Sequence, residues 1–183
     1  YLFRVAALFG GFLGGQVDDL AFRELLVRWF QWACFCPVFR MHGERSPWYE
    51  REQEYIGDVR QLTSGQSNEV WSFGDEVYEI LRKYLFVRER MRPYIREVMR
   101  AAHEHGDPVM RPLFYGFPAD KAAWSVEDEY LFGADVLVAP VLEAGARVRD
   151  VYLPAGADWM DAATGAEYAG GQTVRIDAPL DTM

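Results

Sequence analysis

The clearest hydrophobic pattern along the chain runs from Gly74 to Gly106. Apolar residues recur there at the i, i+3, i+4, i+7 spacing of one helical face, while Arg and Glu fill the opposite face and predict a solvated surface. Because Pro93 removes a backbone donor inside this pattern, we expect it to kink or split the helix. Gly106 is a suitable C-cap, since glycine adopts the left-handed conformation that ends many helices. The apolar positions are Val77, Ile80, Leu81, Tyr84, Leu85, Val87, Met91, Tyr94, Ile95, Val98 and Met99.

A second helix is predicted at residues 18–35, "DDLAFRELLVRWFQWACF", where Asp18 or Asp19 can cap the N-terminus. Its Leu, Trp and Phe residues occupy more than one narrow stripe, so we expect this helix to be buried on most sides. The short apolar run that follows it, "CPVFR" at residues 36–40, favours a β-strand.

The rest of the chain changes from a polar segment to short runs that are typical of β-strands. Residues 44–68 are polar with scattered aromatics and predict a long ordered loop. From residue 109 onward, short runs rich in β-branched and aromatic residues alternate with Gly, Pro, Asp and Ala turns, as in an all-β module. We therefore predict an α/β part, residues 1–112, followed by a β part, residues 113–183.

Composition and charge limit the partners. Half of the 183 residues are hydrophobic and 15% are aromatic, which is enough to bury a sizeable core in one or two domains. The formal net charge is -9, and the Arg residues are spread among carboxylates, whereas a nucleic-acid binder needs a clustered basic face. No apolar run reaches the roughly 18 residues of a membrane span. We expect neither nucleic acid nor membrane as a partner.

The two cysteines, Cys34 and Cys36, are spaced for neither a zinc site nor a disulfide framework. Their aromatic neighbours predict buried free thiols, which suit a reducing compartment, so we expect a cytoplasmic protein. The chain starts at Tyr1 rather than Met and ends at "APLDTM" without a closing signal, which we interpret as a fragment.

A polar cluster, Arg40, His42, Glu44 and Arg45, follows the apolar run at residues 36–40. Helix, strand, polar cluster, long loop and helix form the repeating unit of a (β/α) barrel, in which the chemistry gathers at the C-terminal ends of the strands. Arg40 and His42 then lie where a ligand binds. Two other interpretations stay open at this point: His42 as a satisfied structural histidine, and Arg40 as a charge paired with a carboxylate beside the core.

Six motifs follow one another along the chain: "GGFLGG", "LLVRWFQWACFCPVFRMHG", "LRKYLFVRERMRPYI", "PVMRPLFYGFPAD", "DEYLFGADVLVAPVLEAGARVRDVYLPAGADWMDAATGAEYAGGQ" and "APLD". Together they resemble the retaining α-glycosidases of glycoside hydrolase family 31. The resemblance implies a (β/α)8 TIM barrel followed by β-sandwich domains, of which this chain holds the last barrel segments and the start of the first sandwich. It also implies hydrolysis of α-glucosides or α-xylosides, with an oligosaccharide or α-glycoside as the partner and no metal or cofactor.

The same resemblance implies roles for particular residues. His42, in the family's Arg-x-His motif, contacts the sugar in the -1 subsite, and Phe12 of Gly-Gly-Phe lines that subsite. Arg40 is the charge partner that positions the active-site carboxylates. The nucleophile and the acid/base of the family are aspartates that lie upstream of this chain, so no catalytic residue is expected here. The family's sugar-binding Asp before Ile-Gly-Gly-Phe is replaced by Leu8, and residues 1–9 depart from the family's strand.

Three functional hypotheses follow. The first is the C-terminal part of a family 31 α-glycosidase, which is inactive alone. The second is a non-enzymatic carbohydrate-binding or interaction module with the aromatic-rich loop as its platform, and the third is an inactive product of a damaged gene. An upstream Trp-x-Asp nucleophile motif in frame favours the first, and a Met just before Tyr1 favours the second.

Overall fold

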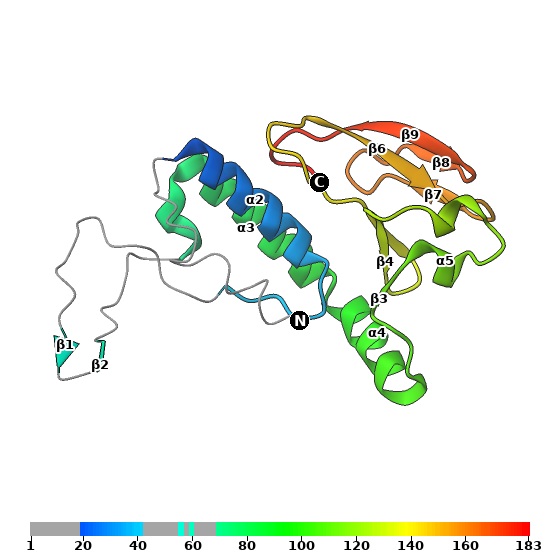
Figure 1. The fold of residues 1–183 in the computed structure, drawn as a ribbon, viewed down its shortest axis with the longest axis horizontal. Coiled ribbons are helices and arrows are strands. Elements are labelled where there is room, and N and C mark those ends of the chain that lie inside the picture. Colours follow the sequence, from blue (N-terminus) through cyan, green and yellow to red (C-terminus); the bar gives the residue numbers. More distant parts are fainter. Residues whose placement is uncertain (1–18, 42–54, 57–58, 61–68) are drawn as a thin grey trace.

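The structure is a computed structural model that describes residues 19–41, 55–56, 59–60 and 69–183. Two long helices, α2 (Leu20–Cys34) and α3 (Asp75–Arg90), lie side by side, and the β-rich C-terminal region packs beyond them (Figure 1). A third helix, α4 (Arg92–His105), leads from this pair into the C-terminal region. Within the described residues, no helix is both long and apolar enough to cross a membrane.

The cap predicted for α2 is confirmed at Asp19. Its carboxylate accepts hydrogen bonds from the backbone N–H groups of Ala21 and Phe22, at 2.9 and 3.3 Å. These two donors have no partner inside the helix, so the cap stabilises the first turn by about 1 kcal/mol. The burial predicted on most sides is confirmed, because eight of the fifteen residues of α2 are buried and they lie all round the helix except along one strip. The exposed residues lie near its start, where Leu20 and Leu25 are 75% and 40% exposed.

The core lies between α2 and α3 and extends to the short 3-10 helix η2 (Val70–Phe73). Each fully buried Leu or Phe in it contributes roughly 1.5–3 kcal/mol through the apolar surface removed from water. The two helices contribute matching apolar stripes, and this is why they pack lengthwise. The buried members are Phe22, Leu26, Val27, Phe30, Cys34, Phe73, Val77, Ile80, Leu81 and Tyr84.

The long amphipathic pattern forms two helices, as Pro93 predicted. Helix α3 ends at Arg90, Met91 separates the two, and Pro93 falls in the first turn of α4. Proline is tolerated there because its missing N–H would have no intrahelical partner anyway. Helix α4 ends at Gly106, which has a φ of 78° and so occupies the left-handed region that favours glycine.

The strand predicted at residues 36–40 is not formed. The chain leaves α2 at Phe35 in a turn and continues to Met41 without regular structure. Strands β1 (Tyr55–Ile56) and β2 (Val59–Arg60) pair antiparallel, and they are the only strands before residue 110 among the described residues. The described part of residues 1–112 therefore contributes helices rather than barrel strands. The loop predicted at residues 44–68 lies mostly outside the described residues.

The C-terminal region is mostly β, as the turn-separated pattern predicted. Strands β3 (Met110–Arg111), β4 (Tyr130–Phe132) and β5 (Val136–Val138) form one antiparallel sheet in that order. Strand β6 (Val148–Leu153) pairs with β9 (Gln172–Asp177), and β7 (Asp158–Met160) pairs with β8 (Glu167–Ala169). The division at residue 112 stays a prediction.

Part of the β-type run at residues 109–117 is helical instead. Helix α5 (Leu113–Gly116) begins directly after Pro112, and the 3-10 helix η3 (Ala122–Trp124) follows it. Proline fixes the backbone angle that precedes a first helical turn, and Leu113 is fully buried, so tertiary packing overrides the local β propensity.

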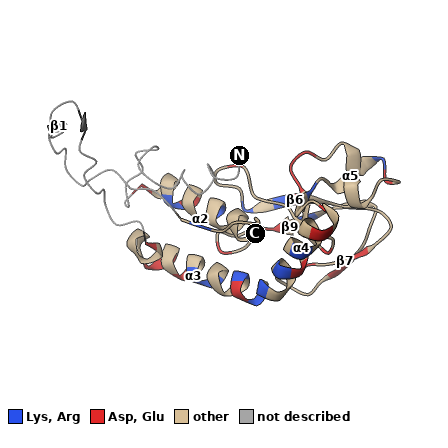
Figure 2. Ribbon diagram, turned by 90° about the horizontal axis from the view of Figure 1, so that it is seen from below, with Lys and Arg blue, Asp and Glu red and all other residues tan. Residues whose placement is uncertain are grey.

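The C-terminal segment returns to α2, where two buried polar side chains hold it. Arg28 donates to the carbonyls of Ala178 and Thr182, both at 2.7 Å, and Gln31 donates to that of Leu180 at 2.7 Å. Buried polar groups are costly unless they are hydrogen-bonded, so these contacts specify where the segment packs. Elsewhere, Figure 2 shows acidic and basic residues interspersed along the ribbons of α3 and α4.

Candidate functional site

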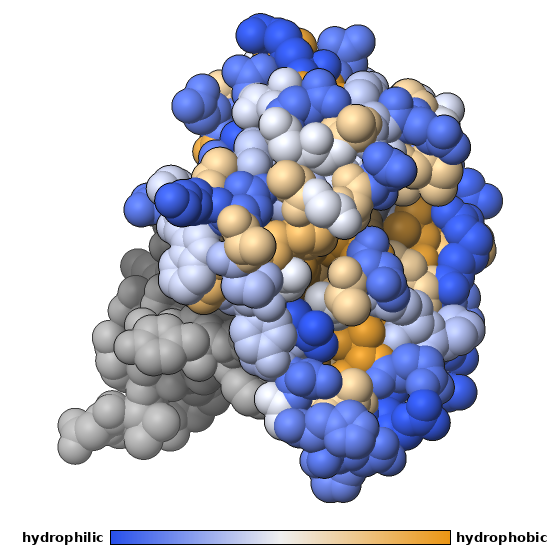
Figure 3. All heavy atoms as spheres, turned by 90° about the vertical axis from the view of Figure 1, so that its right-hand side faces the viewer, coloured by the Kyte–Doolittle hydropathy of each residue, from blue (hydrophilic) through white to orange (hydrophobic). Residues whose placement is uncertain are grey.

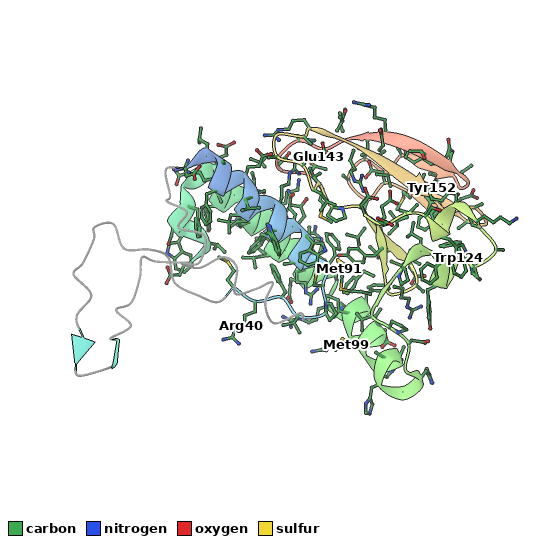
Figure 4. The ribbon with its side chains drawn as sticks, in the orientation of Figure 1. Arg40, Met91, Met99, Trp124, Glu143 and Tyr152 are labelled. Atoms are coloured by element: carbon green, nitrogen blue, oxygen red, sulfur yellow. The ribbon has the colours of Figure 1, made fainter. Side chains whose placement is uncertain are left out.

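The structure describes one of the three predicted site residues. Arg40 is exposed, and Figure 4 shows it on the side of α2 that faces away from the C-terminal sheets. Phe12 and His42 lie outside the described residues. The roles predicted for all three stay predictions. The described part of the site is therefore residues 35–41, which we call the contact segment because it leads from α2 to Arg40 and His42.

The contact segment is held at its start by Arg88 of α3. The guanidinium Nη1 donates to the carbonyls of Cys34 and Cys36, at 2.7 and 2.6 Å, and Nη2 donates to that of Pro37 at 3.0 Å. These are carbonyls at and just beyond the end of a helix, where no intrahelical donor is available. The carbonyls of Cys36 and Pro37, which belong to the predicted strand, therefore bond to Arg88 rather than to a neighbouring strand.

Tyr130 of β4 contributes a further contact from the C-terminal region. Its hydroxyl donates to the carbonyl of Phe35 at 3.1 Å. Burial raises the pKa of Tyr130 above its ordinary value, with the neighbouring Cys36 adding to the effect. The phenol therefore remains protonated and able to donate throughout the physiological pH range.

The residue before Arg40 is fixed by packing. The ring of Phe39 meets that of Phe30 edge to face, with centroids 4.8 Å apart, and the Arg88 guanidinium lies 5.8 Å from the Phe39 centroid. Aromatic pairs of this geometry contribute about 0.5–1.5 kcal/mol beyond the area they bury. Phe39 packs into the core, whereas Val38 is exposed. The backbone is therefore constrained up to Arg40.

Cys34 and Cys36 are buried and free, as the sequence predicted. Burial raises the pKa of Cys34 to about 12 and that of Cys36 to about 11. Both remain thiols near neutral pH, and a thiol is a poor nucleophile and a poor metal ligand. Among the described residues, no group of three His, Cys, Asp or Glu side chains could hold a metal ion. The cysteines therefore serve packing next to the contact segment.

Glu129 is the buried carboxyl group of the described residues. It accepts a hydrogen bond from the backbone N–H of Tyr152 at 2.8 Å, and the guanidinium of Arg149 lies 3.9 Å away. Burial outweighs both of these interactions and raises the pKa of Glu129 to about 7. Its contacts lie with β6 rather than with the contact segment, so we assign it a structural role.

This raised pKa predicts a pH-dependent stability. Between pH 4.5 and 7 the folded protein keeps the Glu129 proton while the unfolded chain releases it, so the free energy of unfolding falls as the pH rises. Glu129→Gln stays neutral and avoids this loss. We expect the variant to be more stable than the original by about 3 kcal/mol at pH 8, with the difference shrinking toward zero near pH 4.5. Urea unfolding followed by tryptophan fluorescence measures this, and a difference that does not change with pH would contradict it.

A separate apolar cavity of about 410 Å³ lies between α2 and residues 140–144. Trp29, Trp32 and Leu25 line one wall, and Leu142 lines the other. Figure 4 shows Glu143, another lining residue, on the opposite side of α2 from Arg40, so the cavity lies apart from the described residue of the predicted site. Figure 3 shows further apolar residues exposed between hydrophilic ones on the C-terminal side of the molecule.

Arg88 and Tyr130 were not predicted as site residues, although the sequence does contain a signal for Arg88. Arg88 follows Leu81 by seven residues and Tyr84 by four, and so continues the buried stripe of α3. A charged residue at a core-facing helical position indicates a polar partner across the packing interface. Tyr130 begins an ordinary apolar run, in which no local feature distinguishes its hydroxyl.

Comparison with known proteins places both parts of the chain in one family. Residues 5–98 match the TIM-barrel domain of glycosyl hydrolases family 31, and residues 106–183 match the C-terminal domain of the same family. An alpha-xylosidase of Saccharolobus solfataricus is 32% identical over 95% of this chain and 21% of its own length. Alpha-glucosidase 2 of Bacillus thermoamyloliquefaciens is 38% identical over 94% of this chain and 20% of its own. The chain thus spans about a fifth of these relatives.

Solved structures agree with this assignment. A family 31 alpha-xylosidase from a soil metagenome, complexed with xylose, is 53% identical and superposes with a TM-score of 0.87 over 93% of this chain and 25% of that one. A family 31 dextranase of Flavobacterium johnsoniae, complexed with glucose, is 36% identical with a TM-score of 0.75 over 92% of this chain and 18% of that one. With two consecutive family matches and this structural likeness, the chain belongs to glycosyl hydrolase family 31.

Proposed function

We propose that these residues form the last part of the catalytic barrel and the following β domain of a retaining α-glycosidase that hydrolyses α-xylosides or α-glucosides. The observation that carries the proposal is the 53% identity, at a TM-score of 0.87, to an alpha-xylosidase complexed with xylose. A cytoplasmic location, which suits the two free thiols, is part of the proposal.

In this proposal the chain binds and orients the sugar, and carboxylates elsewhere in the protein perform the bond changes. In a retaining glycosidase one carboxylate attacks the anomeric carbon while a carboxylic acid protonates the departing oxygen. Water then releases the sugar from the covalent glycosyl-enzyme. His42 and Phe12 would contact the sugar in the -1 subsite, and Arg40 would hold the carboxylates in position. The anchored contact segment supports this division, because it delivers Arg40 from a fixed backbone.

The experiment is an assay of the full-length protein that contains this chain on p-nitrophenyl α-xyloside and α-glucoside, with the β-anomers as controls. We expect hydrolysis of at least one α-anomer, with the first-formed sugar keeping the α configuration by NMR. Hydrolysis of β-anomers alone, or inversion at the anomeric carbon, would contradict the proposal. An inactive protein that nonetheless binds xylose or glucose would support a carbohydrate-binding module instead.

A further inference from the structure

The end of α2 is held by donors from two distant parts of the chain. Carbonyls 34, 36 and 37 accept from Arg88, which lies more than 50 residues later, and the carbonyl of Phe35 accepts from Tyr130, 95 residues later. Four consecutive carbonyls are thereby satisfied by side chains. A helix end on a protein surface is ordinarily satisfied by a glycine turn or by water. This arrangement instead ties the backbone to α3 and to β4 at the same point.

Arg88 is suited to fixing a backbone path. Its planar guanidinium presents donors in a rigid fork, which defines the relative positions of the three carbonyls it reaches. The group is half-buried and lies over the rings of Phe39 and Phe132, with centroids 5.8 and 6.0 Å away. Partial burial of the Arg88 cation costs solvation free energy, and its hydrogen-bond acceptors among the described residues are backbone carbonyl groups. An aliphatic side chain would fill this position without that cost but would leave the carbonyls without a donor.

Tyr130 is itself held in place by its own strand. It belongs to β4, and the Phe132 carbonyl in the same strand accepts a hydrogen bond at 2.7 Å from Tyr94 of α4. Phe132 is fully buried and lies beneath Arg88. Helices α3 and α4, strand β4 and the start of the contact segment therefore form one packed unit.

We propose that Arg88 and Tyr130 are positioning residues, which set the geometry of the contact segment and, through it, the placement of Arg40 and His42 against the sugar. Arg40 follows Pro37, the last anchored carbonyl, by three residues and His42 by five. A misplacement of about 1 Å at a reacting sugar can cost on the order of a hundredfold in rate. The C-terminal β region thereby contributes to substrate contact through Tyr130. The inference rests on the proposed α-glycosidase function.

The test uses three variants of the full-length protein: Tyr130→Phe, Arg88→Lys and Arg88→Met. Tyr130→Phe removes only the hydroxyl, so the ring keeps its packing and the fold is retained. We expect kcat/KM for an aryl α-xyloside or α-glucoside to fall about three- to tenfold for Tyr130→Phe and about ten- to a hundredfold for Arg88→Met. Arg88→Lys should recover only part of the loss, because an ammonium group lacks the rigid fork. Tyr115→Phe and Arg82→Met, both at exposed positions of the described chain, are the matched controls and should keep full activity.

A double-mutant cycle with His42→Ala separates positioning from general destabilisation. If Arg88 and Tyr130 act through the contact segment, replacing either of them should lower kcat/KM markedly less in the His42→Ala background than in the wild-type protein. If the fold-losses in kcat/KM of the single variants simply multiply in the double variants, the inference is overturned. It is also overturned if the variants are as active as their controls. Either result leaves the α-glycosidase proposal intact. A wild-type protein without α-glycosidase activity would overturn both. If Arg88→Met does not fold, Tyr130→Phe and its cycle decide the question.

Discussion

The purified 183-residue chain alone is expected to release no p-nitrophenol from α-xyloside or α-glucoside substrates above the rate of an inactivated control. Glycosyl transfer through a covalent intermediate needs a nucleophile and an acid in fixed opposition, about 5–5.5 Å apart. The family resemblance assigns both groups to segments outside this chain. The resemblance also implies that Leu8 stands where the family has a sugar-binding aspartate, so we expect sugar binding by the chain to be weak as well. Positioning without these carboxylates gives no turnover.

Two carboxylates of this chain allow a test of whether it carries catalytic groups of its own. Glu44 and Glu50 follow the contact segment and are the nearest candidates within the chain for a catalytic pair. Turnover that scales with protein concentration and disappears in Glu44→Gln or Glu50→Gln would show that the chain carries its own catalytic groups. Asp19 is no such candidate, because its carboxylate is occupied by the first turn of α2.

Replacing His42 by alanine in the full-length enzyme is expected to lower kcat/KM by roughly ten- to a hundredfold or more. The physical reason is the loss of a hydrogen bond to a sugar hydroxyl in the -1 subsite, worth on the order of 1–3 kcal/mol. Such bonds can strengthen as the oxocarbenium-like transition state forms, so the loss should appear in kcat as well as in KM. The thermal midpoint should change little, because His42 follows the anchored part of the contact segment.

His105→Ala is the matched control for this experiment. His105 lies in the last turn of α4 with an exposed side chain, and its removal should leave both activity and thermal midpoint unchanged. If His42→Ala instead retains full activity but lowers the midpoint, His42 is a structural histidine.

The helices could be predicted because their signals are local. The cap at Asp19, the stripe from Val77 to Val98, the break at Pro93 and the end at Gly106 are each encoded within a few residues of the feature they specify. The structure confirms the cap, the break and the end, and it buries most of the stripe in α3, whereas Leu85 is 41% exposed and α4 buries only Val98. Backbone propensity and amphipathic spacing act over one or two turns, which is the range that a sequence pattern covers.

The contact segment could not be predicted in the same way. Residues 36–40 have strand-like composition, but donors from Arg88 and Tyr130 occupy the carbonyls at their start. Partners this distant in sequence leave no trace within residues 36–40 themselves. The bounds of strands β7 and β8 could not be predicted for a related reason, since "DWM" and "EYA" are too short to show alternation and are defined by pairing with each other.

The candidate site was predictable only in part. Composition and spacing predicted that Arg40 and His42 lie in a ligand site, whereas their proposed roles came from the resemblance to family 31. Arg88 could have been found from its place on the buried face of α3, but the carbonyls it holds could not. Tertiary hydrogen bonds between a side chain and a distant backbone are specified by the whole fold.

The central claim is that this chain orients the sugar while carboxylates outside it perform the chemistry. The most direct measurement traps the covalent glycosyl-enzyme in the full-length protein with a fluorinated α-glycosyl fluoride and maps the labelled peptide by mass spectrometry. We predict a single labelled aspartate upstream of Tyr1, with unlabelled peptides throughout residues 1–183 and slower labelling in His42→Ala. A label on any Asp or Glu within these 183 residues would contradict the account.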